Sequence, residues 1–296
     1  MSLLNKILRK LKTEGLPGIV SAIRLRLRPP RIRGFRLYRP LFLNASGLEI
    51  GGPSLIFSRR GLVPIYPLVA HLDGCNFNAQ TMWEGKIQEG QTYAYAPRKK
   101  KGRQFILEAT DLAAIASGIY DFVAASHILE HTANPLKALR EWLRVLKDEG
   151  VLLLVIPHRD GAFDHRRQLT SFAHLLEDFA NDTREDDMTH AEEFMERIDL
   201  AGTAYGEDRA GFVERTQRNL EFRGMHHHVF DTALVLRLFD YFNLRILAVD
   251  VERPFHIIVL GQKVAAGVSC DNSRFFAGDA PYKHVSPFPS DHRVAP

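Results

Sequence analysis

Residues 134–157, NPLKALREWLRVLKDEGVLLLVIP, constrain the fold more than any other stretch. Asn134 is a good helix N-cap, and Pro135 occupies the first helical position, where proline is favoured. Four leucines follow at helical spacing and predict one buried face: Leu136, Leu139, Leu143 and Leu146. The apolar run VLLLVIP comes next and predicts a strand buried on both faces, as in a parallel sheet. A helix followed directly by such a strand is one unit of an alternating α/β fold.

Earlier and later segments extend this alternation. Predicted strands are LEI, PIYPLVAHLDG ending at Asp73, RQFILEATDL running into Asp111, and the start of YDFVAASHILEH. A late helix, TALVLRLFDYF, precedes a closing strand pair, LRILAVDVE and FHIIVLGQK. The pattern predicts an α/β protein with a doubly wound, Rossmann-like, mostly parallel sheet.

Changes in composition divide the chain into five parts. We expect a basic amphipathic arm at 1–44, the core at 45–160, a helical insertion or lid at 161–225, the end of the core sheet at 226–264, and an irregular tail at 265–296. Within the insertion, helices are predicted near 170–180 and 190–200.

The charge is concentrated in the arm. Residues 1–40 hold eleven Lys or Arg and one acid, which gives +10, whereas the whole chain carries only +4. Leucines and an isoleucine between 3 and 11 share one helical face opposite the basic residues. Such a helix either docks on the body or contacts anionic lipid at the membrane periphery. Nucleic acid is a weaker candidate partner, since no aromatic stacking platform accompanies the arginines.

Composition also bears on location. The two cysteines, Cys75 and Cys270, do not form a disulfide framework or a zinc motif. No apolar run reaches the roughly 18–20 residues that span a bilayer. The N-terminus lacks the features of a signal peptide. These observations predict a cytoplasmic enzyme, with the arm as the part that would touch the inner face of the membrane.

Residues 47–57, GLEIGGPSLIF, place a glycine turn directly after the first predicted strand. Gly51 and Gly52 have no Cβ, so the backbone there lets a ligand approach closely. Asp73 follows at a spacing suited to a ribose, and Asp111 and Ser126 end later strands. Ligands bind at this edge of open α/β sheets, so the ordered set predicts a nucleotide-type cofactor site.

The quoted motifs resemble those of class I S-adenosylmethionine-dependent methyltransferases, of the type-11 methyltransferase-domain group. YDFVAASHILEHTANPLKALREWLRVLKDEGVLLLVIP resembles the family's fourth strand, E-H turn, following helix and fifth strand, and LEIGGPS resembles its first motif. The resemblance covers roughly residues 45–160. It implies S-adenosylmethionine as cofactor, with these binding residues: Glu49, Gly51, Gly52, Ser54, Asp73, Asp111 and Ser126.

The first motif departs from the family at one point. Pro53 and Ser54 stand where the family has a further glycine. Proline removes an N–H donor and fixes φ, so the turn must differ in shape. The hydroxyl of Ser54 is a candidate replacement for the lost donor. We interpret the turn as a variant cofactor site, and a decayed site is the alternative.

Histidines near predicted strand ends are the candidate bases for methyl transfer to a hydroxyl, because imidazole titrates near neutral pH. His158 is the first candidate, followed by His228 and His127. The insertion offers a second polar set for binding the acceptor: Asp160, Asp164, His165, Arg166 and His226. Asp160, Asp164, His226 and His228 are acceptable metal ligands, but their spacing matches no ligand motif, so we predict no metal site.

We therefore predict an S-adenosylmethionine-dependent methyltransferase that methylates an oxygen of a sugar, glycan or other small hydroxylated acceptor. A similarity to bacterial surface-glycan methyltransferases, in the GGPS turn and the FDH segment, favours the glycan class. Two alternatives stay open: a non-catalytic protein with the same fold, and a nucleic-acid methyltransferase that uses the basic arm.

Overall fold

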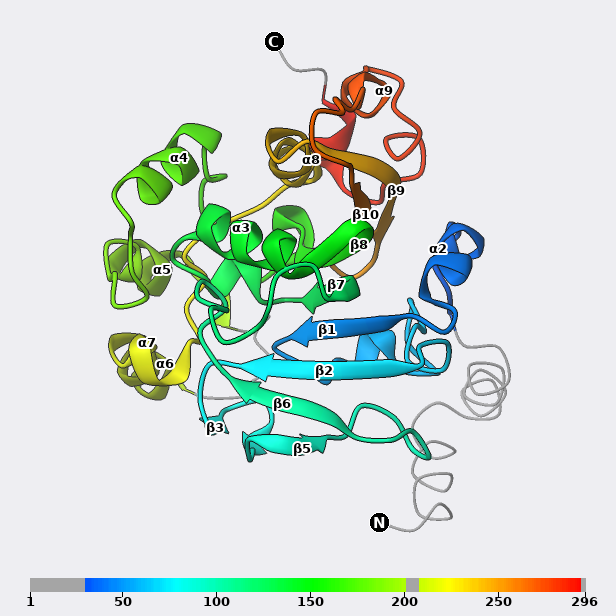
Figure 1. Ribbon diagram of the computed structural model, residues 1–296. Helices are drawn as coiled ribbons and strands as arrows, with labels where there is room; N and C mark the ends of the chain where they lie inside the picture. The colour runs from blue at the N-terminus through cyan, green and yellow to red at the C-terminus, as the bar shows by residue number, and fades with distance from the viewer. Residues whose placement is uncertain (1–29, 201–207, 294–296) are drawn as a thin grey trace, which may run out of the picture.

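The computed structural model describes residues 30–200 and 208–293, which form an eight-stranded sheet flanked by helices (Figure 1). The strand order is β5-β6-β2-β1-β7-β8-β10-β9. Five neighbouring strands are parallel: β6 (Gly102–Ile106), β2 (His71–Asn76), β1 (Ser46–Ile50), β7 (Tyr120–Ser126) and β8 (Leu146–Pro157). Three strands pair antiparallel to their neighbours: the edge strands β5 (Gly90–Tyr93) and β9 (Leu244–Glu252), and β10 (His256–Lys263) between β8 and β9. The mostly parallel α/β sheet predicted from the sequence is confirmed.

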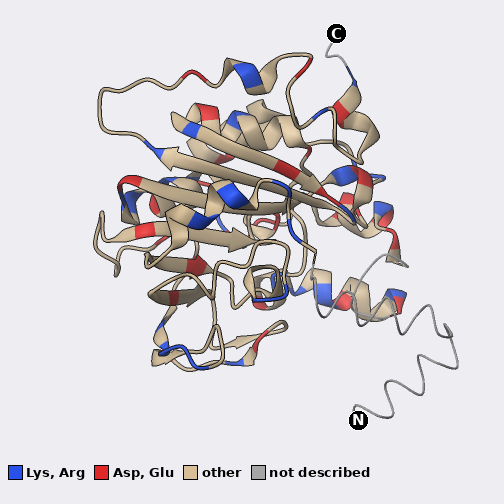
Figure 2. Ribbon diagram, turned by 90° about the vertical axis from the view of Figure 1, so that its right-hand side faces the viewer, with Lys and Arg blue, Asp and Glu red and all other residues tan. Residues whose placement is uncertain are grey.

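Both faces of the sheet are buried, as β8 shows. Leu152, Leu154 and Ile156 pack on one side, while Leu153 and Val155 pack on the other. The first side is covered by α3 (Pro135–Val145) and α8 (Thr232–Tyr241), whose apolar residues join the same core. Charged residues are found mainly on the helices and loops around the sheet (Figure 2). The VLLLVIP run is thus a central strand, as predicted.

The predicted helix after β7 is confirmed in detail. The side chain of Asn134 accepts a hydrogen bond of 3.0 Å from the backbone N–H of Lys137, so it caps α3. Trp142 of this helix is fully buried and donates its indole N–H to the carbonyl of Ala109. This contact ties α3 to the loop after β6.

The boundaries of two strands differ from the prediction. Strand β2 begins only at His71, because Pro64 and Pro67 cannot donate to a ladder and fall in the preceding loop. The strand then runs past Asp73 and ends at Asn76. Strand β6 ends at Ile106, and the chain then turns before it reaches Asp111. Both acids are therefore displaced from the strand ends where we expected them.

The described part of the N-terminal region packs against the sheet through α2 (Phe35–Phe42). Phe42 contacts Phe122 of β7 at a ring-centroid distance of 4.9 Å, edge to face. Tyr38 donates a hydrogen bond of 2.9 Å to Asp250 of β9. The amphipathic helix predicted between residues 3 and 11 lies outside the described residues, as does its predicted membrane contact.

The insertion is helical, as predicted, and has its own small core. Its helices are α4 (Phe172–Ala180), α5 (Ala191–Arg197), α6 (Arg209–Gln217) and α7 (Asn219–Phe222). Phe194, Phe212 and Met225 are buried together between them. Figure 1 shows α5, α6 and α7 beside the carboxyl ends of β1, β2 and β6. Among the described helices, none is both long and apolar enough to cross a bilayer.

Two smaller features complete the fold. A hairpin of β3 (Gln80–Thr81) and β4 (Gly85–Lys86) follows β2 and carries Trp83 at its turn. The tail, predicted as irregular, contains the short helix α9 (Ser273–Phe276) and buries Phe275, Tyr282 and Phe288 in the main core. The tail is thus part of the packed structure up to residue 293.

Candidate active site

The turn after β1 brings bare backbone to the end of the sheet. Gly51 adopts a positive φ of 76°, a conformation that favours glycine. A Cβ at this position would meet Cδ1 of Ile128 at 2.0 Å, so no larger residue fits. The following segment is the three-residue 3-10 helix Leu55–Phe57 rather than a long helix. Gly51 therefore presents its main chain to the space between β1, β2 and β7.

Gly52 has a different role from the one we expected. A Cβ there would meet the carboxyl group of Glu49 at 2.2 Å and the hydroxyl of Tyr93 at 2.3 Å. Its open side is thus filled by neighbouring side chains, and only Gly51 of the two glycines lines the cavity described below. Gly52 lets the turn close over a buried carboxylate.

That carboxylate, Glu49, is fully buried and anchors the turn. It accepts hydrogen bonds from the hydroxyls of Tyr66 and Tyr93, and from the backbone N–H of Ser54 at 2.9 Å. Burial raises the pKa of Glu49, while the hydrogen bonds from Tyr93, Tyr66 and Ser54 oppose that shift. Glu49 thus positions the glycine turn from below and does not itself line the cavity.

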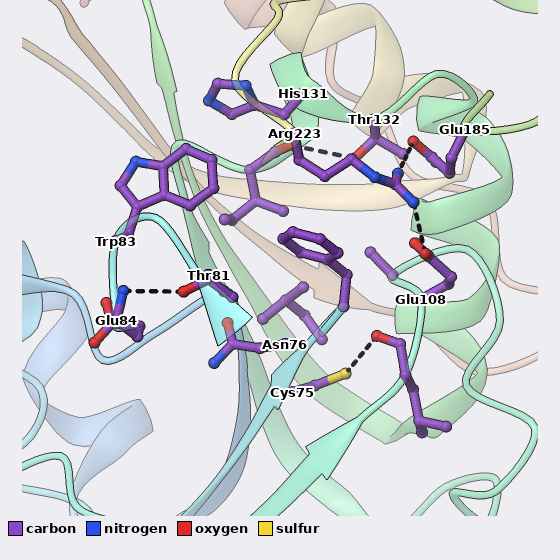
Figure 3. Close-up of a pocket in the computed structure, with 16 residues that line it drawn as sticks. Cys75, Asn76, Thr81, Trp83, Glu84, Glu108, His131, Thr132, Glu185 and Arg223 are labelled. Atoms are coloured by element: carbon purple, nitrogen blue, oxygen red, sulfur yellow. Dashed lines mark hydrogen bonds and ion pairs between the residues drawn. The ribbon is translucent and has the colours of Figure 1, made fainter. Parts of the chain in front are cut away.

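A cavity lies at the carboxyl ends of β1, β2 and β6 (Figure 3). We call it the β2–β6 cavity. Its apolar part is lined by Ile50, Cys75, Phe77, Leu107, Ala109 and Ile128. Its polar part is lined by Asn76, Thr81, Glu84, Glu108, His131, Thr132, Glu185 and Arg223, with Gly51 and Trp83 completing the wall.

Asn76, rather than Asp73, stands at the end of β2 beside this cavity. The amide of Asn76 donates a hydrogen bond of 3.1 Å to the carbonyl of Gly52, which joins the two strand ends. Asp73 lies three residues earlier, and its carboxylate receives hydrogen bonds from the hydroxyl of Tyr120 and the backbone N–H of Arg103, with His71 2.7 Å away. The expected placement of Asp73 is therefore wrong, because the strand is longer than predicted.

The same displacement applies after β6. Glu108 lines the cavity, whereas Asp111 lies beyond it and accepts a hydrogen bond from the backbone N–H of Ala113. Glu108 forms an ion pair of 2.6 Å with Arg223, which also binds Glu185 at 2.6 Å. Arg223 from the insertion thus links the loop after β6 to the segment after α4 across the cavity mouth (Figure 3).

The residues of the cavity fit the adenosine part of S-adenosylmethionine. A planar base needs an apolar slot, which Leu107, Ala109 and Ile128 provide. Exocyclic amino and ribose hydroxyl groups need acceptors, and Glu84 and Glu108 supply carboxylates. Gly51 lines both this slot and a second hollow. Its main chain can therefore face the part of the cofactor that extends beyond the nucleoside.

The second hollow, which we call the His127 groove, has a volume of about 730 Å³ and shares Gly51, Trp83, Glu84 and Ile128 with the cavity. Much of its wall is apolar and comes from Pro30, Pro53, Leu55, Ile56 and Leu62. Its polar side chains include the predicted residues Ser54, Ser126 and His127, together with His256, Ser58 and Arg60. Three of our candidates therefore meet at one surface beside the glycine turn.

His127 is held in an unusual backbone conformation at the edge of this groove, with a positive φ of 56°. Its Nε2 lies 3.0 Å from Nδ1 of His256, and its Nδ1 lies 3.4 Å from Oε1 of Glu130. Burial and the neighbouring His127 lower the pKa of His256 to about 3. His256 is therefore a neutral imidazole near neutral pH.

The other two candidate bases are in the wrong place for a reaction in the groove. His158 is fully buried, stacks on Phe288 and accepts a hydrogen bond from the backbone N–H of Asp160. His228 is buried, and its Nε2 lies 3.2 Å from the carbonyl of Ala133. Strand ends in this fold are partly covered by the insertion and the tail, so a histidine after a strand is not necessarily accessible.

The predicted acceptor-binding set is divided. Asp164 and His226 are buried together, 2.9 Å apart. Asp160, His165 and Arg166 are exposed and face neither the cavity nor the groove. Asp160 accepts from the backbone N–H of Ser290, and Arg166 lies 3.8 Å from Asp199. The structure thus gives no support to these three as acceptor ligands.

Trp83 offers a direct test of cofactor binding. The cavity has a volume of about 60 Å³, whereas typical small-molecule sites have about 300–1,000 Å³. Adenosine therefore requires the hairpin that carries Trp83 to shift outward. The chain has two tryptophans, and Trp142 is fully buried in α3, so we expect a saturable change in Trp83 fluorescence as S-adenosylmethionine is added.

The control for this titration is Trp83→Phe. The variant should bind the cofactor by calorimetry with little change in fluorescence. A fluorescence response that survives in Trp83→Phe, or a wild-type protein that binds with no response, would contradict the hairpin movement.

Comparison with known proteins agrees with the core described above. Residues 87–154 match the family model described as a methyltransferase domain. This match covers β5 through most of β8, including the turn with His127 and helix α3. No curated protein sequence matches the chain.

Two solved structures are similar to this chain at low sequence identity. An S-adenosylmethionine-dependent methyltransferase from Mesorhizobium loti is 12% identical, with 78% of this chain and 96% of that chain covered and a TM-score of 0.43. The 1,6-didemethyltoxoflavin-N1-methyltransferase of Burkholderia thailandensis, solved with S-adenosylhomocysteine, is 10% identical, with 90% and 92% covered and a TM-score of 0.43.

The walls of the β2–β6 cavity combine part of the matched segment with the ends of β1 and β2, which lie outside the match. The match over residues 87–154 indicates an enzyme with a methyltransferase domain, and the residues of the cavity fit S-adenosylmethionine as its cofactor.

Proposed function

We propose that this chain is an S-adenosylmethionine-dependent methyltransferase that acts on an oxygen of a small hydroxylated acceptor, of the sugar or glycan class, with His127 as the base. The observation that carries the proposal is the position of His127 in the His127 groove beside Gly51. The cofactor supplies a methyl group on a sulfonium, which already carries a good leaving group. An acceptor hydroxyl, by contrast, must lose its proton, so a base beside the glycine turn is useful for oxygen.

The neighbours of His127 favour one tautomer. The carboxylate of Glu130 faces Nδ1, so a proton on Nδ1 is favoured over a lone pair there. Nε2 then has the lone pair and accepts a hydrogen bond from Nδ1–H of His256 at 3.0 Å. An acceptor hydroxyl that replaces His256 at this position would donate its proton to Nε2 as the new oxygen–carbon bond forms. The arrangement is that of a base oriented by a carboxylate.

The lining of the groove supports a polyhydroxylated acceptor. Ser54, Ser58 and Ser126 present hydroxyl groups, and Arg60 and Glu84 present charged groups of opposite sign. A sugar has several hydroxyls that can pair with these groups, while its apolar ring face can pack against Leu55, Ile56 or Trp83 in the same wall. The open groove also accommodates one end of a longer glycan.

The test is a screen with S-adenosylmethionine carrying a carbon-13 methyl group. The full chain is incubated with sugars, sugar nucleotides and short glycans, and in parallel with amine and RNA acceptors. We expect a product whose carbon-13 shift identifies an O-methyl group. Methylation of nitrogen, or of RNA alone, would overturn the proposal, as would a lack of product in every arm with a protein that binds the cofactor.

A further inference from the structure

Three potential metal ligands meet next to the β2–β6 cavity. Glu130 and His131 lie in the 3-10 helix Leu129–His131 directly after β7, and His226 lies in the segment before α8. One donor atom from each of the three side chains lies within 4.8 Å of the other two. His226 comes almost a hundred positions after His131 in the sequence. The fold brings the two side chains together where the chain leaves the insertion and rejoins the core.

Each of the two imidazoles is held through its Nδ1 by a second residue. Nδ1 of His131 lies 3.1 Å from the carbonyl of Met225, and Nδ1 of His226 lies 2.9 Å from Oδ2 of Asp164. These partners favour a proton on Nδ1, which leaves Nε2 of each ring with a lone pair. Metal-binding histidines in proteins almost always have such a carbonyl or carboxylate partner behind them.

Glu130 supplies an independent observation. Its side chain is only 1% exposed, and neither carboxylate oxygen has a hydrogen-bond partner within the described ranges. Nδ1 of His127 lies 3.4 Å from Oε1, which is longer than an ordinary hydrogen bond. A buried carboxylate without full hydrogen bonding is unfavourable, so a cation bound through Oε2 would compensate its charge while Oε1 continues to face His127.

We propose that Glu130, His131 and His226 bind a divalent transition-metal ion of the Zn²⁺ type. A carboxylate oxygen and two imidazole nitrogens are ligands that Zn²⁺ accepts, and in a tetrahedral site they would lie about 3.4 Å apart. The side chains need to close by little more than 1 Å to reach that geometry. Three protein ligands leave one position for water or another oxygen ligand, as in catalytic rather than purely structural zinc sites.

The metal would also join two parts of the fold. The turn after β7 lies within the residues that match a methyltransferase domain, whereas Asp164 lies near the start of the insertion and His226 directly follows it. The ring of His131 lies 5.4 Å from that of Trp83 at the cavity wall. An ion at this point would therefore fix the insertion against the cofactor side of the sheet.

A second histidine cluster provides the matched control. His174, His190 and His228 also have donor atoms within 4.8 Å of one another. There, Nε2 of His174 and Nε2 of His190 are 2.9 Å apart and partner each other, and Oδ2 of Asp178 lies 3.4 Å from Nε2 of His174 and 3.7 Å from Nε2 of His228. We place the ion at the first cluster because both of its imidazoles are held by a partner at Nδ1, whereas Nδ1 of His228 has no hydrogen-bond partner in the described structure.

The experiment uses the full chain without a histidine tag, stripped with a chelator and titrated with Zn²⁺ alone. The variants are Glu130→Gln, His226→Ala and Asp164→Asn, with His190→Ala as the control. Uptake is measured by elemental analysis and calorimetry, and the visible spectrum of the Co²⁺-loaded wild type reports coordination by nitrogen and oxygen.

We expect one tightly bound ion per chain in the wild type and in His190→Ala. Affinity should fall at least tenfold in Glu130→Gln and His226→Ala, and about 10–100-fold in Asp164→Asn, which removes only the partner of a ligand. No stoichiometric uptake by the wild type, or loss of the ion in His190→Ala with retention in the other variants, would overturn the proposal. Because the readout is metal content, failure here would leave the proposed methyl acceptor untouched.

Discussion

Replacing Glu49 by alanine is expected to lower the free energy of unfolding by about 2–6 kcal/mol and to abolish cofactor binding. The reason is that the hydroxyls of Tyr66 and Tyr93 lose their acceptor, while the N–H of Ser54 loses one of its two acceptors and keeps the hydroxyl oxygen of Tyr66. A buried donor without a partner costs about 1–3 kcal/mol. The Gly51–Ser54 turn would then lose the group over which it folds. Urea unfolding followed by circular dichroism measures the first effect, and calorimetry with S-adenosylmethionine measures the second.

Two matched variants separate the lost acceptor from a general disturbance. Glu49→Gln keeps one carbonyl oxygen and should cost less than Glu49→Ala. Tyr95→Phe changes the same group of aromatic residues, but the Tyr95 hydroxyl is buried without a hydrogen-bond partner in the described structure, so its removal should be neutral or stabilising. Equal stability of wild type and Glu49→Ala would show that Glu49 does not hold the turn.

Local signals in the sequence were sufficient for the fold. The capped helix α3, the apolar strand β8 and the closing strand pair follow from caps and hydrophobic periodicity, which act between near neighbours in the chain. The resemblance to the methyltransferase family added the cofactor. These elements confirm that alternation of strand and helix predicts a mostly parallel sheet.

The ends of the strands were less predictable than the strands themselves. These shifts changed which residues line the predicted cofactor site. Both predicted acids were placed about three residues too far from the residue that lines the cavity: Asp73 instead of Asn76, and Asp111 instead of Glu108. A strand end depends on which neighbour continues the ladder, and that pairing is not encoded locally. The position of Glu108 in the sequence was the only local signal for its role in the cavity, since this carboxylate directly follows the last apolar residues of the predicted strand.

Contacts between the insertion and the core could not be predicted from the sequence. Arg223 reaches Glu108, and Asp164 reaches His226, only because the insertion folds back on the core. Buried histidines such as His158 and His228 are hard to distinguish from catalytic ones, since a single backbone partner makes burial tolerable for a neutral ring. His256 lies in a strand already predicted, but nothing nearby in the chain pointed to His127 as its partner.

Replacing His127 by asparagine is expected to lower kcat by about 10²–10⁴-fold for a hydroxyl acceptor, the usual contribution of general base catalysis. Asparagine suits the test because it tolerates the positive φ of 56° at this position better than alanine does. It also keeps a polar side chain beside Glu130 but cannot take up a proton near neutral pH. The affinity for S-adenosylmethionine and the melting temperature should stay close to those of the wild type.

The measurement is kcat and KM across pH with the acceptor that the screen identifies. Any pH dependence of kcat that comes from the base should vanish in His127→Asn, because the asparagine side chain takes up no proton in this range. His165→Asn is the control, since that histidine is exposed and away from the groove. A kcat in His127→Asn within about threefold of the wild type, with an unchanged pH profile, would be incompatible with His127 as the base, because a general base contributes far more than that.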